Sequence, residues 1–124
     1  MKSVLKIEEE KLKDELNKIK EEDGLIGCIL SSAEGLVIVE ALGDMGYDST
    51  LISAMAANMI IGDNLGYLMP NEMILIYEKE KIAIKRFEIS NKNLDLIIIL
   101  LMSSKKRYFR NSIRRALKIV RKAL

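Results

Sequence analysis

The most regularly spaced reactive side chains in this sequence form a basic row near the C-terminus. The row contains Arg107, Arg110, Arg114, Lys118 and Arg121, which follow one another at intervals of three or four residues. Such spacing places side chains along one side of a helix. A basic helix of this kind could bind nucleic acid or an anionic membrane, with an affinity that falls steeply as salt rises. It could also contact a protein partner, or form an ordinary solvated or ion-paired surface.

The formal charge is divided unevenly along the chain. Nine of the 20 lysine and arginine residues lie between positions 105 and 124, where there is no acidic residue. The other 104 residues carry 11 bases and 18 acids, although the net charge of the whole chain is only +2. The basic character is therefore concentrated at one end of the sequence.

The other reactive residues give little support for an enzyme. The chain has no histidine and one cysteine, so neither a zinc site nor a histidine-activated nucleophile is expected. There is no G-x-x-x-x-G-K-[ST] motif, and the early glycines do not form a dinucleotide fingerprint. Carboxylates such as Glu8, Glu9, Asp14 and Glu15 follow the pattern of a solvated helix surface. We therefore assign no catalytic residue, no metal ligand and no cofactor.

The single cysteine and the N-terminal residues bear on the compartment. Cys28 lies in an apolar, strand-like run, so we expect a small core residue rather than a reactive thiol. A lone cysteine cannot form an intrachain disulfide, which suits a reducing compartment. The first residues become acidic before a signal-peptide core could form, and we expect a cytoplasmic protein.

Residues 48–68 form the least polar candidate helix, with Asp63 as the only charge after Asp48. A helix that is apolar or small nearly all the way round must be covered on more than one side. The larger side chains lie on one arc, which we expect to face the core: Leu51, Ile52, Met55, Met59 and Leu65. The smaller side chains lie on the opposite arc, which we expect to be a self-association and docking face: Ser53, Ala56, Ala57, Ile60 and Asn64.

The alternative for this segment is a purely structural role, as a buried central helix with alanine wherever space is tight. A membrane span is not expected, because the apolar run is only about half of the roughly 20 residues that a bilayer requires.

Hydrophobic patterning predicts eight elements in a chain whose 124 residues suit one domain. High Lys, Glu and Ile contents match the composition reported for proteins of very hot organisms. The continuous apolar run at 94–102 predicts a strand buried on both faces, which requires helices on each side of a sheet. The expected order is helix 4–20, strands 25–30 and 36–41, helix 48–68, strands 72–77, 82–89 and 94–102, and helix 105–124.

This order and two local motifs resemble a known family. Gly24-Leu25-Ile26-Gly27 opens the first strand, Ser32-Ala33-Glu34-Gly35-Leu36 forms the first turn, and the second helix is rich in alanine. In these features the chain resembles the roadblock family of dynein light-chain-like proteins, and within it the prokaryotic MglB-type regulators of small GTPases. It departs from the family turn in having Glu34-Gly35 where Asp-Gly is common.

The resemblance implies an α+β, three-layer αββαβββα sandwich with a five-stranded antiparallel sheet. The second helix lies on one face and the first and last helices on the other, as in profilin and longin domains. The resemblance also implies a homodimer in which second helices abut and third strands pair. Met73, Leu75 and Tyr77 of the third strand would then join the small arc of the second helix in the interface.

The resemblance further implies a non-catalytic scaffold that binds and regulates a small Ras-like GTPase of the MglA type. Such a protein could insert an arginine that neutralises charge developing on the phosphates of the bound nucleotide, and Arg86 or an arginine of the last helix could serve. Alternatively, it could reposition the GTPase's own residues. We favour repositioning, because no arginine falls in the predicted docking helix. The alternatives are an anion-binding module that uses the basic helix and a structural adaptor in a larger assembly. In the implied fold the acidic first helix lies beside the basic last helix, which would partly neutralise it.

Overall fold

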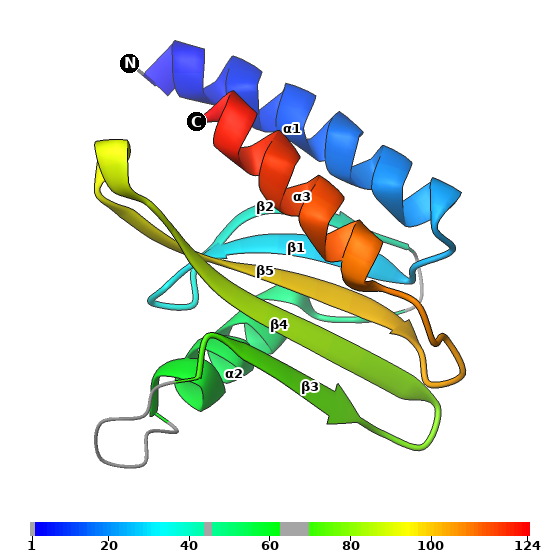
Figure 1. The fold of residues 1–124 in the computed structure, drawn as a ribbon. Helices are drawn as coiled ribbons and strands as arrows, with labels where there is room; N and C mark the ends of the chain where they lie inside the picture. The colour runs from blue at the N-terminus through cyan, green and yellow to red at the C-terminus, as the bar shows by residue number, and fades with distance from the viewer. Residues whose placement is uncertain (1, 44–45, 63–69) are drawn as a thin grey trace.

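The computed structural model describes residues 2–43, 46–62 and 70–124, with side chains from residue 9 onward. The predicted αββαβββα order is confirmed, and a short 3-10 turn (Ser90–Lys92) is added between the last two strands. Figure 1 shows the elements in their order along the chain. They are α1 (Lys2–Glu22), β1 (Gly27–Ser32), β2 (Val37–Leu42), α2 (Ser49–Gly62), β3 (Glu72–Ile76), β4 (Glu80–Ile89), β5 (Leu94–Ser103) and α3 (Arg110–Ala123).

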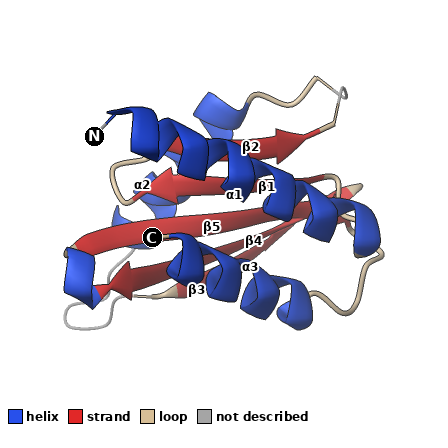
Figure 2. Ribbon diagram, turned by 90° about the horizontal axis from the view of Figure 1, so that it is seen from above, coloured by secondary structure: helices blue, strands red, loops and turns tan. Residues whose placement is uncertain are grey.

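The five strands form one antiparallel sheet in the order β2-β1-β5-β4-β3. Helices α1 and α3 lie side by side on one face and α2 lies on the other, as expected (Figure 1 and Figure 2). The sheet therefore has two edges, β2 and β3. The pairing of β1 with β2 changes register between Leu30 and Ser31, because Ile38 is an extra residue on β2.

Strand β5 organises the two cores, as its apolar run predicts. Every residue from Leu96 to Met102 is buried. Leu96, Ile98, Leu100 and Met102 point into the core beneath α1 and α3, whereas the side chains between them point toward α2. Because side chains alternate along a strand, an uninterrupted apolar run can supply both cores at once.

The last helix begins later than the sequence predicts. It starts at Arg110 rather than at Lys105, so Arg107 lies in the irregular segment before the helix and is not part of the helical row. The turn follows the end of β5, where the Lys106 amide donates to the Ser103 carbonyl at 3.0 Å. The Lys81 ammonium donates to the Lys106 carbonyl at 2.7 Å, and Phe109 is buried just before the helix. These contacts stabilise a turn where periodicity alone indicates a helix.

The turn between β1 and β2 packs directly on α2. Gly35 has a φ of +89°, a conformation that favours glycine. A Cβ at this position would lie 3.0 Å from the Ala54 Cα and 3.2 Å from the Ala57 Cβ. Gly35 is thus required both by its backbone conformation and by the closeness of α2.

We expect Gly35→Ala to lower the free energy of unfolding by about 2 to 4 kcal/mol, since it combines backbone strain with a clash against a helix. Gly24→Ala is the matched control: its φ is +66°, but no atom lies within 4 Å of the added Cβ, so the cost should be about 1 kcal/mol. Urea unfolding of both variants measures the difference. Equal losses would contradict the close contact between the turn and α2.

Candidate partner-binding surface

Helix α2 turns its small side chains toward its own sheet, which is the reverse of the prediction. The four described residues of the expected docking arc, Ser53, Ala56, Ala57 and Ile60, are at most 6% exposed. By contrast, Leu51 of the arc expected to face the core is 68% exposed. The assignment of the small arc as an accessible docking face is therefore wrong. Asn64 and Leu65 lie outside the described residues.

The physical reason is close packing. Small side chains let α2 approach the sheet and the Gly35 turn, and Ala56, Ala57 and Ile60 share a core with Ile29 and Ile84. Larger side chains at these positions would hold the helix away from the sheet. Because both arcs lack charge, the 3.6-residue period separates them without identifying which one is inside.

The outward side of α2 is uncharged, and its large apolar residues lie there together with the exposed Ala54 and Asn58. Leu51 is exposed, while Ile52, Met55 and Met59 are half-buried and leave part of each side chain open to solvent. Ser49 to Gly62 contain no charged residue. Methionine adapts readily to irregular partner surfaces, so this arc has the character of a protein-binding surface.

Strand β3 continues this apolar surface to the edge of the sheet. Met73 and Leu75, two of the predicted interface residues, are half-buried and pack against the same core as Ile52 and Met55. Tyr77, just past the strand end, is 49% exposed, and its hydroxyl lies 4.0 Å from the Met55 sulfur. The structure thus brings the three predicted β3-side residues next to the outward arc of α2. We call this combined area the α2/β3 surface: Leu51, Ile52, Met55, Met59, Met73, Leu75 and Tyr77.

Two exposed isoleucines of β3 were not among the predicted interface residues. Ile74 and Ile76 point to the α1/α3 side of the sheet, and Ile76 is 72% exposed. The sequence signal that could have identified them is strand alternation, which places residues 74 and 76 on the face opposite Met73 and Leu75.

The outer edge of β3 is open for pairing with another strand. At its two ends, the Tyr77 amide donates to the Glu80 carbonyl at 2.8 Å and the Arg86 amide donates to the Asn71 carbonyl at 2.7 Å. In an antiparallel pair the hydrogen-bonded positions alternate, so residues 73 and 75 also bond to β4. The amides and carbonyls of Glu72, Ile74 and Ile76 therefore point away from the sheet.

Two of the arginines that could be inserted into a GTPase, Arg86 and Arg110, are paired with acids of the same chain. The Arg86 guanidinium contacts both carboxylate oxygens of Asp95, at 2.6 to 3.2 Å, and these hydrogen bonds raise the pKa of Arg86. Arg110 pairs with Glu72 at 2.9 Å. Neither guanidinium projects freely from the α2/β3 surface.

Acidic residues at the end of α1 neutralise only part of the positive charge of α3. Arg115 pairs with Glu22 and Asp23 at 3.0 Å, and Asp23 also accepts the buried Ser112 hydroxyl at 2.5 Å. Among the described acids, none forms an ion pair with Arg114, Lys118 or Arg121, although Arg121 lies 5.8 Å from the centre of the Phe87 ring. Most of the basic row is therefore exposed charge.

Comparison with solved structures identifies the architecture. Myxococcus xanthus MglB superimposes with a TM-score of 0.74 at 13% identity, covering 90% of this chain and 86% of that one. The chain has the MglB-type roadblock fold. The gliding protein MglB of Thermus thermophilus gives a TM-score of 0.71 at 12% identity, covering 94% and 90% of the two chains. A Roadblock/LC7 domain from Streptomyces avermitilis gives 0.53 at 8% identity, covering 80% and 79%.

A further MglB, described as having a tetrameric arrangement, gives a TM-score of 0.72 at 14% identity and covers 94% of this chain and 93% of that one. Neither the protein-family models nor the curated proteins gave a match. The likeness to the roadblock structures therefore concerns the fold, since all four identities are low.

The described residues contain no group of three or more His, Cys, Asp or Glu side chains placed to hold a metal ion. No helix in the described ranges combines the length and apolar character needed to cross a membrane. Cys28 is fully buried in the core beneath α1 and α3, as expected of a core residue. Burial raises the pKa of its thiol to about 12, so the nucleophilic thiolate is suppressed.

We expect the Cys28 thiol to resist Ellman's reagent at about pH 8 in the native protein and to react fully once the chain is unfolded. Its folded pKa lies above the ordinary value of 9.0, so its contribution to stability is intact below about pH 9 and is lost as the pH rises further. Cys28→Ala should therefore reduce the fall in unfolding free energy above pH 9. Rapid labelling of the native thiol would contradict the burial.

Proposed function

We propose that this chain is a non-catalytic, homodimeric scaffold that binds and regulates a small Ras-like GTPase in the cytoplasm. The observation that carries the proposal is the apolar α2/β3 surface beside an open strand edge. An apolar helix face and an unpaired edge are both unfavourable in water, and association with a second molecule covers both. The resemblance to MglB-type regulators, now supported by the fold, indicates the class of partner.

Pairing of β3 with β3 of a second copy is the favoured mode of self-association. An antiparallel pair about a two-fold axis uses the same outward amides and carbonyls on both chains. The two α2 helices would then lie next to each other on one side of the joined sheet. The partly exposed side chains of Leu51, Met55 and Met59 would form a continuous apolar area for a GTPase, with Tyr77 at its margin.

Regulation by repositioning is better supported than a donated arginine. The Arg86 guanidinium is occupied by Asp95, and α2 carries no charged residue. A scaffold that binds one conformation of a GTPase more tightly than another shifts the equilibrium between them toward the first. The shift is set by the difference in affinity, so the scaffold needs no catalytic group of its own.

The exposed bases of α3 favour the second candidate function, an anion-binding module. Arg114, Lys118 and Arg121 are exposed, and no described acid pairs with them. A chain that is not retained on DNA or on acidic vesicles at low salt would exclude this candidate. A chain that dimerises and recovers no GTPase would instead be a structural adaptor.

Self-association is tested by Ile74→Pro. Proline lacks the outward amide but leaves the bonds to β4 intact, so the fold should persist while the dimer weakens at least about tenfold. Ile74→Thr is the control, because it also removes apolar surface but keeps the amide. Sedimentation over a concentration series measures both. A Pro variant that sediments like the parent would show that β3 does not pair between copies.

Partner binding is tested by Leu51→Arg and Met55→Arg, assayed against small Ras-like GTPases of the same organism loaded with GDP or GTP. Each variant should remain folded and lose at least about tenfold in affinity, which corresponds to about 1.4 kcal/mol. Lys18→Glu on α1 is the control, because Lys18 is exposed on the opposite side of the sheet. Unchanged binding by both arginine variants would refute the proposed docking surface.

A further inference from the structure

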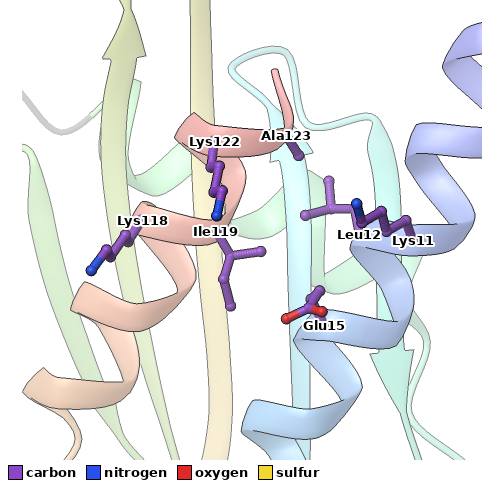
Figure 3. Close-up of a pocket in the computed structure, with 7 residues that line it drawn as sticks. All are labelled: Lys11, Leu12, Glu15, Lys118, Ile119, Lys122 and Ala123. Atoms are coloured by element: carbon purple, nitrogen blue, oxygen red, sulfur yellow. The ribbon is translucent and has the colours of Figure 1, made fainter.

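A groove lies between α1 and α3, on the side of the sheet opposite the α2/β3 surface (Figure 3). Its volume is about 620 Å³, within the range of roughly 300 to 1,000 Å³ that is typical of small-ligand sites. The lining side chains come from both helices: Lys11, Leu12, Glu15, Lys118, Ile119, Lys122 and Ala123. The inference from this groove does not depend on the proposed GTPase partner.

The floor of the groove is apolar. Leu12 is buried and belongs to the core, while Ile119 and Ala123 are half-buried and pack against that core. In Figure 3, Leu12 and Ile119 project from the two helices into the space between them. The methylene stems of the neighbouring lysines add to this apolar area. A ligand that lies here must present hydrocarbon to the floor.

The rim of the groove is basic. Lys11 and Lys122 lie beside the space between the helices in Figure 3, whereas Lys118 is directed away from α1, and no described acid forms an ion pair with any of the three. Glu15 is the one acid in the lining, and its carboxylate is paired with Lys18 at 3.8 Å. The lining therefore carries a net positive charge, so the rim favours an anion.

We propose that this groove binds a free anionic amphiphile, a single aliphatic chain that ends in a carboxylate or a phosphate. The chain lies along Leu12, Ile119 and Ala123, and the anionic end pairs with the ammonium groups of Lys11 and Lys122, one from each helix. A neutral apolar ligand would leave the charges of the rim unmatched, and a small inorganic anion would leave the floor in water.

The first experiment titrates the intact, isotope-labelled chain with decanoate below its micelle concentration and follows backbone amides by NMR. Decanoate should shift the amides of residues 11–15 and 118–123 with saturation. Decanol and decyltrimethylammonium, which keep the chain but lack the negative charge, should bind at least about tenfold more weakly. Absence of saturable shifts, or equal binding of the three probes, would overturn the proposal.

The second experiment compares two double variants with the same change in charge. Lys11→Gln with Lys122→Gln should weaken decanoate binding at least about tenfold, whereas Arg107→Gln with Arg114→Gln, outside the groove, should change it less than about twofold. Ile119→Trp fills the groove from a half-buried position and should abolish binding, and Ile119→Ala should weaken it without adding bulk.

An Arg107/Arg114 control that loses as much affinity as the Lys11/Lys122 variant would show that the effect is general electrostatic attraction and not a site. Binding only to phosphatidylglycerol vesicles, with none to monomeric decanoate, would also overturn the proposal, because the surface would then dock on a membrane. Thermal unfolding of every variant confirms that each comparison is made on folded protein.

Discussion

The close approach of α2 to its sheet is the constraint on which the surface chemistry depends. Ser53, Ala56 and Ala57 occupy the side of the helix that meets the sheet, and Gly35 lies so close that an added Cβ would be 3.0 Å from the Ala54 Cα. Apart from Ile60, that side carries small residues, and Leu51, Met55 and Met59 lie toward solvent together with Ala54 and Asn58. Close packing on the inner side thus leaves several larger apolar residues of α2 at the surface.

The two faces of the sheet carry different kinds of surface. The α2 face has an uncharged helix next to an open strand edge, whereas the α1/α3 face has lysines and arginines around a groove. Arg86 with Asp95, and Arg115 with Glu22 and Asp23, are held in pairs that fix neighbouring elements. A protein partner on one face and a small anion on the other could be bound at the same time, since the two areas share no residue.

The architecture was predictable from the sequence because its strongest signals are local. The apolar run that became β5 indicates burial on both faces by its length and continuity, and the order of elements follows from turns and periodicity. The orientation of α2 was not predictable in this way, because neither of its arcs carries a charge to mark the solvent side. The orientation of α2 depends on its contact with Gly35, which lies in the turn between β1 and β2. The position of Arg107 likewise depends on Lys81, which contacts the Lys106 carbonyl from a distant strand.

The extra residue in β2 has a consequence for how large an assembly can grow. If two sheets join through β3, the joined sheet ends in β2 on both sides, and two free edges would ordinarily permit polymerisation into filaments. The bulge at Ile38 twists this edge and breaks its regular ladder. The chain thus has one strand edge suited to pairing and one that resists it, a combination that favours a closed complex over an open-ended fibre.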